Sequence, residues 1–135
     1  MSIASDRRTW VPAVLTPVGT MRVLLANEPR SYRETLAAAI PALRPGVEVV
    51  AVAPGDLDGA IAHHRPHLVV CSALTPLVQQ GALAWLLLYP DGASGSVRCL
   101  AEERADIPRM DLSGLLGLLD ATGRLIAGDP DRLNA

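Results

Sequence analysis

The chain has 135 residues, of which 50% are hydrophobic, 19% charged and 3% aromatic, and its formal net charge is −2. This length suits one domain with a buried core, and the apolar content is too high for a disordered chain. All twelve cationic residues are arginines, which excludes chemistry that needs a lysine, and the lack of a basic cluster argues against a nucleic-acid partner.

The amino-terminal segment, residues 1–20, is expected to be a flexible extension in front of a folded domain over residues 21–128, with a short tail over 129–135. Arg7-Arg8 is weakly similar to a twin-arginine export signal, but Pro12 and Pro17 interrupt the apolar residues that follow. No apolar run approaches the roughly 20 residues of a membrane span. We therefore expect a cytoplasmic protein that makes no contact with a membrane.

The first predicted elements are a strand and a helix. Residues 23–26 form a short apolar run that is typical of a strand buried on both faces. Ser31 and Glu34 have the spacing of a capping box, which predicts a helix that begins at about residue 31. Pro41 lacks a backbone donor and should kink or stop that helix near Ile40.

The next elements continue an alternation of strands and helices. Residues 47–52 are rich in valine and predict a second strand. Asp56 is a suitable N-cap for a short helix that Pro66 stops, and residues 68–71 form a third apolar run. Strand, helix, strand, helix and strand in this order predict a parallel sheet with right-handed crossovers.

The second half of the chain predicts a different arrangement. Residues 84–89 and 96–100 are apolar runs on either side of a loop that is too short for a parallel crossover, so they should form an antiparallel hairpin. Asp111 should cap a last helix, with Gly123 just past its end. The predicted fold is a three-layer α/β domain with a five-stranded sheet, an antiparallel edge hairpin and a C-terminal helix.

The last helix also suggests an interface. Its main apolar stripe consists of leucines spaced to face the sheet, namely Leu112, Leu115, Leu116 and Leu119. Leu118 lies off this stripe, and its exposure beside Leu115 or Leu119 would give an apolar ridge. A homodimer through this ridge is one expectation, and an ordinary exposed leucine is the alternative.

Three segments of the chain resemble the receiver domain of bacterial response regulators. Residues 22–36 resemble the opening strand, acidic pair and first helix of that family, and residues 47–52 resemble its second strand. Residues 65–72 resemble the third strand, which ends in the phosphoacceptor aspartate, and Pro76 matches a proline four residues beyond it. The resemblance implies a flavodoxin-like fold and a role in signal transduction.

The residues at the receiver's site differ from the family pattern. The resemblance implies a Mg²⁺ ion held by an acidic pair and an acceptor aspartate, but Asn27, Glu28 and Ser72 occupy those positions. The family's lysine has no counterpart, and Tyr89 and Pro90 lie where a hydroxyl residue is expected. We therefore expect a degenerate pseudo-receiver that is not phosphorylated and holds neither metal nor cofactor.

The sequence contains residues typical of two other kinds of site. His63 and His67 have the spacing of a helical zinc pair, but Pro66 between them should keep their rings off a common face, so no metal site is expected. Ser72 lacks the flanking glycines of a nucleophile elbow, so we expect no catalysis there. Cys71 and Cys99 lie in apolar runs and should be free thiols, with a disulfide as the alternative.

The predicted function is a non-enzymatic signalling or protein-interaction module with a protein partner. The alternative is a regulatory domain that binds a small ligand or a nucleotide. In an open α/β sheet, ligands bind beyond the carboxyl ends of the strands where the strand order reverses. That crevice would be lined by the polar residues after the first and third strands, namely Asn27, Glu28, Ser72 and Thr75.

Overall fold

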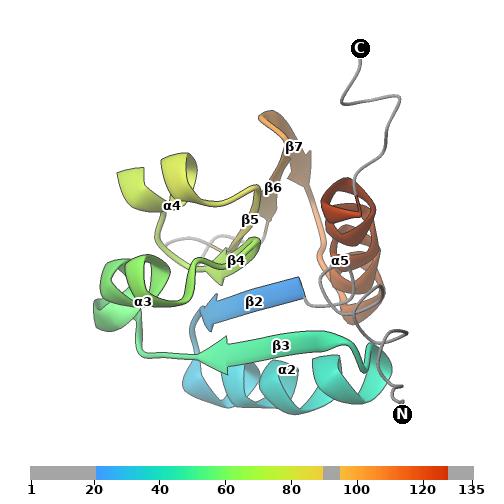
Figure 1. The fold of residues 1–135 in the computed structure, drawn as a ribbon, viewed down its shortest axis with the longest axis horizontal. Helices are drawn as coiled ribbons and strands as arrows, with labels where there is room; N and C mark the ends of the chain where they lie inside the picture. Colours follow the sequence, from blue (N-terminus) through green and yellow to red (C-terminus); the bar gives the residue numbers. More distant parts are fainter. Residues whose placement is uncertain (1–20, 90–94, 128–135) are drawn as a thin grey trace, which may run out of the picture.

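The computed structural model describes residues 21–89 and 95–127, which form a six-stranded sheet covered by helices (Figure 1). In these ranges no helix has both the length and the apolar character that a membrane crossing requires. The elements in chain order are β2 (Met21–Ala26), α2 (Arg30–Leu43), β3 (Val47–Ala51), the 3-10 helix η1 (Pro54–Asp56), α3 (Leu57–His64), β4 (Leu68–Cys71), α4 (Pro76–Gly81), β5 (Ala84–Leu88), β6 (Ser96–Leu100), β7 (Glu103–Ile107) and α5 (Leu112–Ile126).

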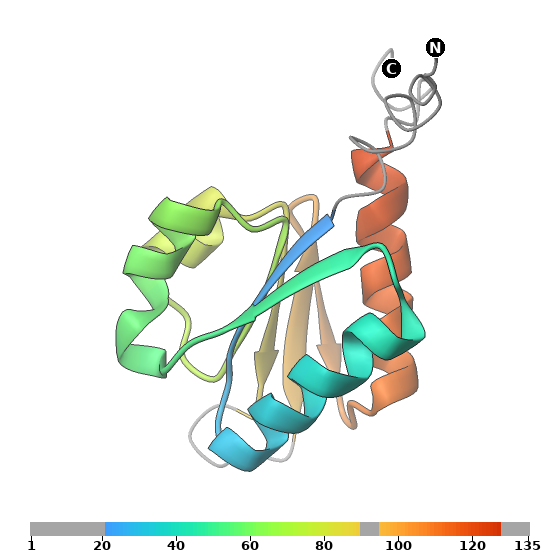
Figure 2. The ribbon, with the colours of Figure 1, turned by 60° about the horizontal axis from the view of Figure 1, so that its bottom comes forward.

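The sheet is mixed, with the strand order β3-β2-β4-β5-β6-β7. The first four strands in this order are parallel to one another, whereas β6 is antiparallel to both β5 and β7. Helices α2 and α5 cover one face and α3 and α4 cover the other, so the domain has three layers (Figure 2). The α/β class and the parallel strand-helix alternation over residues 21–71 are confirmed.

Helix α4 was not predicted from the sequence, and it forms the crossover that keeps β5 parallel to β4. It has only six residues, too few to show a helical repeat of apolar positions. The start of α4 nevertheless has two features that are typical of a helix N-terminus. Thr75 is the N-cap and accepts a hydrogen bond from the Val78 N–H at 3.2 Å, and Pro76 occupies the first turn.

The antiparallel hairpin of β5 and β6 is confirmed, with Leu88 opposite Ser96 and Ala84 opposite Leu100. Residues 90–94 of its loop lie outside the described residues. The prediction that this hairpin forms the edge of a five-stranded sheet is wrong, because β7 adds a sixth strand beyond β6. Three of the five residues of β7 are charged, and its apolar alternation is limited to Ala105 and Ile107, which is too short to predict a strand.

The sheet separates two apolar cores. Leu24 and Val69 are completely buried on neighbouring central strands, as expected. The predicted ridge on α5 is wrong, because the side chains of Leu115, Leu118 and Leu119 are each no more than 2% exposed. The buried residues of α5 are Leu115, Leu118, Leu119 and Thr122, so the buried stripe is shifted around the helix from the predicted one and these leucines form part of the core on that face.

Helix boundaries differ from the predictions at three places. The Ser31 capping box is wrong: α2 begins at Arg30, and the Glu34 carboxylate pairs with the Arg30 side chain at 2.7 Å instead. Helix α2 continues through Pro41 to Leu43, since a proline in the last turn removes few helical hydrogen bonds. Helix α5 continues past Gly123 to Ile126, and its predicted Asp111 cap is confirmed by a 2.8 Å bond from the Gly114 N–H.

Candidate functional site

The carboxyl ends of β2 and β4 meet where the strand order reverses. Ala26 is opposite Cys71 in the parallel register, so the residues that follow each strand are brought together. The backbone N–H of Glu28 donates a hydrogen bond to the Ser72 hydroxyl at 2.8 Å. Two residues 44 positions apart are thus joined directly at the reversal, where open α/β sheets place their ligands.

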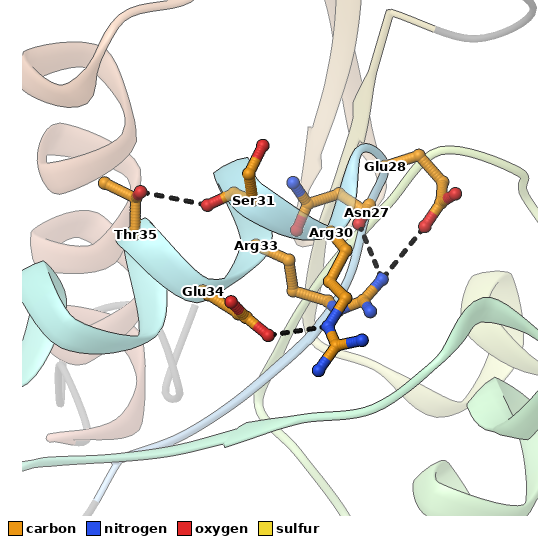
Figure 3. A network of polar contacts seen from close by, with 7 residues as sticks. All are labelled: Asn27, Glu28, Arg30, Ser31, Arg33, Glu34 and Thr35. Carbon is orange, nitrogen blue, oxygen red and sulfur yellow. Dashed lines mark hydrogen bonds and ion pairs between the residues drawn. The ribbon is translucent and has the colours of Figure 1, made fainter.

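A buried arginine closes the same end of the sheet from the first turns of α2. The Arg33 guanidinium donates from one nitrogen to the Asn27 carbonyl at 3.1 Å and to the Glu28 carboxylate at 3.0 Å (Figure 3). The Arg33 side chain is 10% exposed, whereas that of Glu28 is 57% exposed. The only carboxylate among the predicted crevice residues is therefore neutralised by a cation from the same chain.

Arg33 was not among the residues predicted from the sequence, although one signal was present. Leu36 and Ile40 lie three and seven positions after Arg33, which puts all three on the buried face of α2. A charged residue on an apolar stripe rarely becomes fully buried unless it is paired. The Glu28 carboxylate and the Asn27 carbonyl provide that pairing.

The Asn27 side chain is the second unusual feature of this end of the sheet. Asn27 is completely buried, and neither its Nδ2 nor its Oδ1 atom has a hydrogen-bond partner among the described residues. In Figure 3 the dashed contacts of Asn27 reach its backbone carbonyl and none reaches the side-chain amide. A buried amide without partners destabilises the folded state by about 1–3 kcal/mol, so Asn27 is an energetically unfavourable residue at this position.

The Thr75 hydroxyl forms hydrogen bonds with Asp58 and Val78 rather than with Asn27, Glu28 or Ser72. Its hydroxyl donates to the Asp58 carboxylate at 2.8 Å and also caps α4. It therefore connects α3 to α4. The structure brings Asn27, Glu28 and Ser72 together through hydrogen bonds, and it directs the Thr75 hydroxyl toward the helices of one face.

The thiols offer no nucleophile near this site. Cys71 and Cys99 are free and buried, as expected. Burial raises the pKa of the Cys71 thiol to about 12, so this group is protonated at neutral pH even though it precedes Ser72. Cys71 therefore acts as a small apolar residue of β4.

The histidines lie at the other end of β4. His63 and His64 are on α3, which ends at His64, and Arg65 adopts a left-handed conformation with a φ of 50°. His67 belongs to the segment before β4, where its Nδ1 atom accepts a hydrogen bond from the Arg22 N–H at 3.0 Å. Within residues 21–89 and 95–127 no group of three potential metal ligands is found.

A cavity in the structure lies away from the reversal point. It has a volume of about 500 Å³ and lies at the amino-terminal edge of the sheet, between β2, the turn before β3 and α5. Arg44 and Asp120 border it and form a bidentate ion pair, with N···O distances of 2.8 and 2.9 Å. Apolar residues also line this cavity, among them Met21, Val47, Leu119 and Ala127.

The chemistry available at the reversal point is limited. The Glu28 carboxylate is paired with Arg33, the Ser72 hydroxyl accepts a hydrogen bond from the Glu28 backbone, and the Asn27 carbonyl accepts one from Arg33. A single neutralised carboxylate is a weak ligand for a hard cation such as Mg²⁺, which prefers several oxygen ligands. In comparisons with known proteins, the chain matches no protein-family model, no curated protein and no solved structure.

Proposed function

We propose that this protein is a receiver-like signalling or protein-interaction module of the cytoplasm that neither accepts phosphate nor catalyses a reaction. The observation that carries the proposal is the 2.8 Å hydrogen bond from the Glu28 N–H to the Ser72 hydroxyl. In the family that residues 22–76 resemble, these two positions hold a metal ligand and the phosphoacceptor. Here the backbone N–H of Glu28 binds the Ser72 hydroxyl, and the Glu28 carboxylate binds Arg33.

The charge at this end of the sheet supports the same proposal. Receiver phosphorylation requires carboxylates around Mg²⁺, because the metal neutralises the oxygens of the transferring group. In this chain the Arg33 guanidinium forms an ion pair with the Glu28 carboxylate at 3.0 Å, and the Asn27 side chain carries no charge. A role through protein contacts needs neither the metal nor the phosphate.

The proposal is tested by incubating the full chain with acetyl phosphate and Mg²⁺ and measuring its intact mass. A phosphorylation-competent receiver serves as the positive control, and Ser72→Ala is the matched variant. We expect no phosphoryl adduct on the wild-type chain. A hydroxylamine-sensitive adduct would overturn the proposal, as would a stable adduct that Ser72→Ala abolishes, because either would mean that the chain accepts phosphate.

A second candidate function, binding of a small ligand or nucleotide, is favoured by the Asn27 amide. A ligand that supplies a donor and an acceptor to this buried group would satisfy both of its orphaned atoms. A ligand that binds only the folded state raises the melting temperature by mass action. A nucleotide that raises the melting temperature of the wild type but not of Asn27→Leu would establish this function, and no shift with any nucleotide would reject it for that class.

A further inference from the structure

The strand β7 forms one free edge of the sheet. Among the described residues it pairs with β6 alone, and Figure 1 shows it as the last strand. It follows β6 through a two-residue turn, in which Ala101 and Glu102 have φ angles of 52° and 73°. Such a turn with two positive φ angles is the favoured connection of a tight hairpin.

The register of this hairpin indicates which backbone groups of β7 face outward. Leu100 and Glu103 flank the two-residue turn, so they form a hydrogen-bonded pair, and such pairs alternate along an antiparallel ladder. Ala105 and Ile107 therefore also bond toward β6. The N–H and C=O groups of Arg104 and Asp106 then point away from the sheet, as a template for another strand.

The charges of β7 favour one occupant of this edge, which is a second copy of β7. An antiparallel pair centred on Ala105 places Arg104 opposite Asp106 twice, and the outward backbone groups of the same residues meet in hydrogen-bonded pairs. Shifting the centre to Arg104 or to Asp106 also joins outward groups, but it places like charges opposite each other. Only the register centred on Ala105 both joins the outward backbone groups and places opposite charges across from each other.

The other edge strand, β3, lacks this self-complementarity. Its sequence, Val47–Ala51, contains a single charged residue, Glu48, so self-pairing brings no opposite charges together. Arg104, Asp106 and Glu103 are all exposed on β7. The pattern of alternating charges is therefore specific to the edge that carries Arg104.

We propose that two copies of this protein associate through their β7 strands in antiparallel fashion, which joins the two sheets into one continuous sheet. Two Arg104–Asp106 cross-strand pairs set the register. This interface goes beyond the proposed function and lies apart from Asn27, Glu28 and Ser72. A negative result here therefore leaves the receiver-like proposal unaffected, and phosphorylation of the chain would leave the interface unaffected.

The side chain of Arg104 provides a spectroscopic reporter of the association. Its guanidinium lies over the Trp85 ring, 5.1 Å from the ring centroid. An Asp106 carboxylate from a second copy would compete for this guanidinium, so association should alter the emission of Trp85. The only other tryptophan is Trp10, and Trp10→Phe removes its contribution.

The test measures the mass of the full chain by analytical ultracentrifugation over a range of concentrations. We expect a concentration-dependent dimer that Arg104→Asp and Asp106→Arg each weaken by about tenfold or more, because two attractive pairs become repulsive. The double variant with both changes should restore dimerisation, since it exchanges the two charges. Glu48→Arg on β3 is the matched control and should leave the dimer unchanged.

Circular dichroism of each variant separates a loss of association from a loss of folding. Asp106→Arg keeps Arg104 and its contact with Trp85, so any loss of association in this variant cannot come from loss of that contact. A wild-type chain that stays monomeric at all concentrations would overturn the proposal. A dimer that neither single charge reversal weakens, or that the double variant fails to restore, would also overturn it.

Discussion

His67 illustrates how a single side chain can couple stability to pH. Its Nδ1 atom accepts a hydrogen bond from the Arg22 N–H at 3.0 Å, and its own backbone N–H donates to the Arg22 carbonyl at 2.8 Å. Burial, and secondarily the positive charge of Arg22, lowers the pKa of His67 below 6.5. The folded state therefore favours the neutral ring.

The sign of the resulting pH dependence follows from this shift. Between the folded pKa and the unfolded value of about 6.5, the unfolded chain binds more protons at His67 than the folded chain does. The contribution of His67 is complete above pH 6.5 and is lost progressively as the pH falls from that value through the lower pKa of the folded state. We expect the urea midpoint to decrease as the pH falls below about 6.5.

The source of this decrease is tested with two substitutions. His67→Gln retains a hydrogen-bond acceptor but does not titrate, so it should reduce the loss of stability in this pH range. His63→Gln changes an exposed histidine on α3 and should retain the wild-type dependence. If the urea midpoints of His67→Gln follow the same pH curve as the wild type, another group is responsible.

Arg33 and Asn27 show which parts of the site could be predicted residue by residue. Asn27, Glu28 and Ser72 follow the ends of apolar runs, and the carboxyl ends of neighbouring parallel strands lie on the same edge of a sheet. Their proximity was therefore predictable. The contact of Arg33 with the Asn27 carbonyl depends on how α2 is set against β2, which residue spacing alone does not specify.

At the scale of elements, α5 shows a limit of helical periodicity. The leucine stripe predicted both the helix and its Asp111 cap, but it assigned Leu118 to the surface. Leu118 is 2% exposed, whereas Leu112 at the start of the same helix is 37% exposed. The stripe predicted from leucine spacing is therefore displaced around the helix: packing against the sheet buries Leu118 and Thr122 and leaves Leu112, which was expected to face the sheet, exposed.

These two leucines make a matched pair of substitutions. Leu118→Ala should lower the free energy of unfolding by about 2–5 kcal/mol, because it removes buried methyl groups and leaves a cavity. Leu112→Ala should change it by no more than about 0.5 kcal/mol. Urea unfolding measures both values. Equal effects of the two substitutions would contradict the placement of α5.

The strands β6 and β7 show a second limit at this scale. The antiparallel hairpin of β5 and β6 was predictable, because a short loop cannot return the chain for a parallel strand. The sequence of β7 contains only two alternating apolar residues, Ala105 and Ile107, and its strand conformation depends on pairing with β6. The conformation of such a polar segment is therefore decided by its neighbour in the sheet.

The whole molecule depends on its two central strands. Leu24 in β2 is completely buried, and it lies opposite Val50 on one side and Val69 on the other. Leu24→Ala should lower the free energy of unfolding by about 2–5 kcal/mol through lost burial and the remaining cavity. Leu43→Ala, at a position that is 45% exposed, is the control and should have little effect.

The cooperativity of this loss is also testable. If residues 21–127 unfold as one unit, circular dichroism and tryptophan fluorescence should report the same urea midpoint in the wild type and in Leu24→Ala. A loss below 1 kcal/mol would mean that β2 is not a central strand. Separate midpoints for the two probes would show that the parallel and antiparallel halves of the sheet unfold independently.

The sequence alone determined the α/β class, the parallel strands around β2 and β4, the antiparallel hairpin and the grouping of Asn27, Glu28 and Ser72. Each of these depends on local information, namely apolar runs, caps, loop length and the geometry of parallel strands. The tertiary structure decided the sixth strand, the short helix α4, the burial of Leu118 and the contacts of Arg33. These features arise from contacts between segments far apart in the chain, and such contacts can override local propensity.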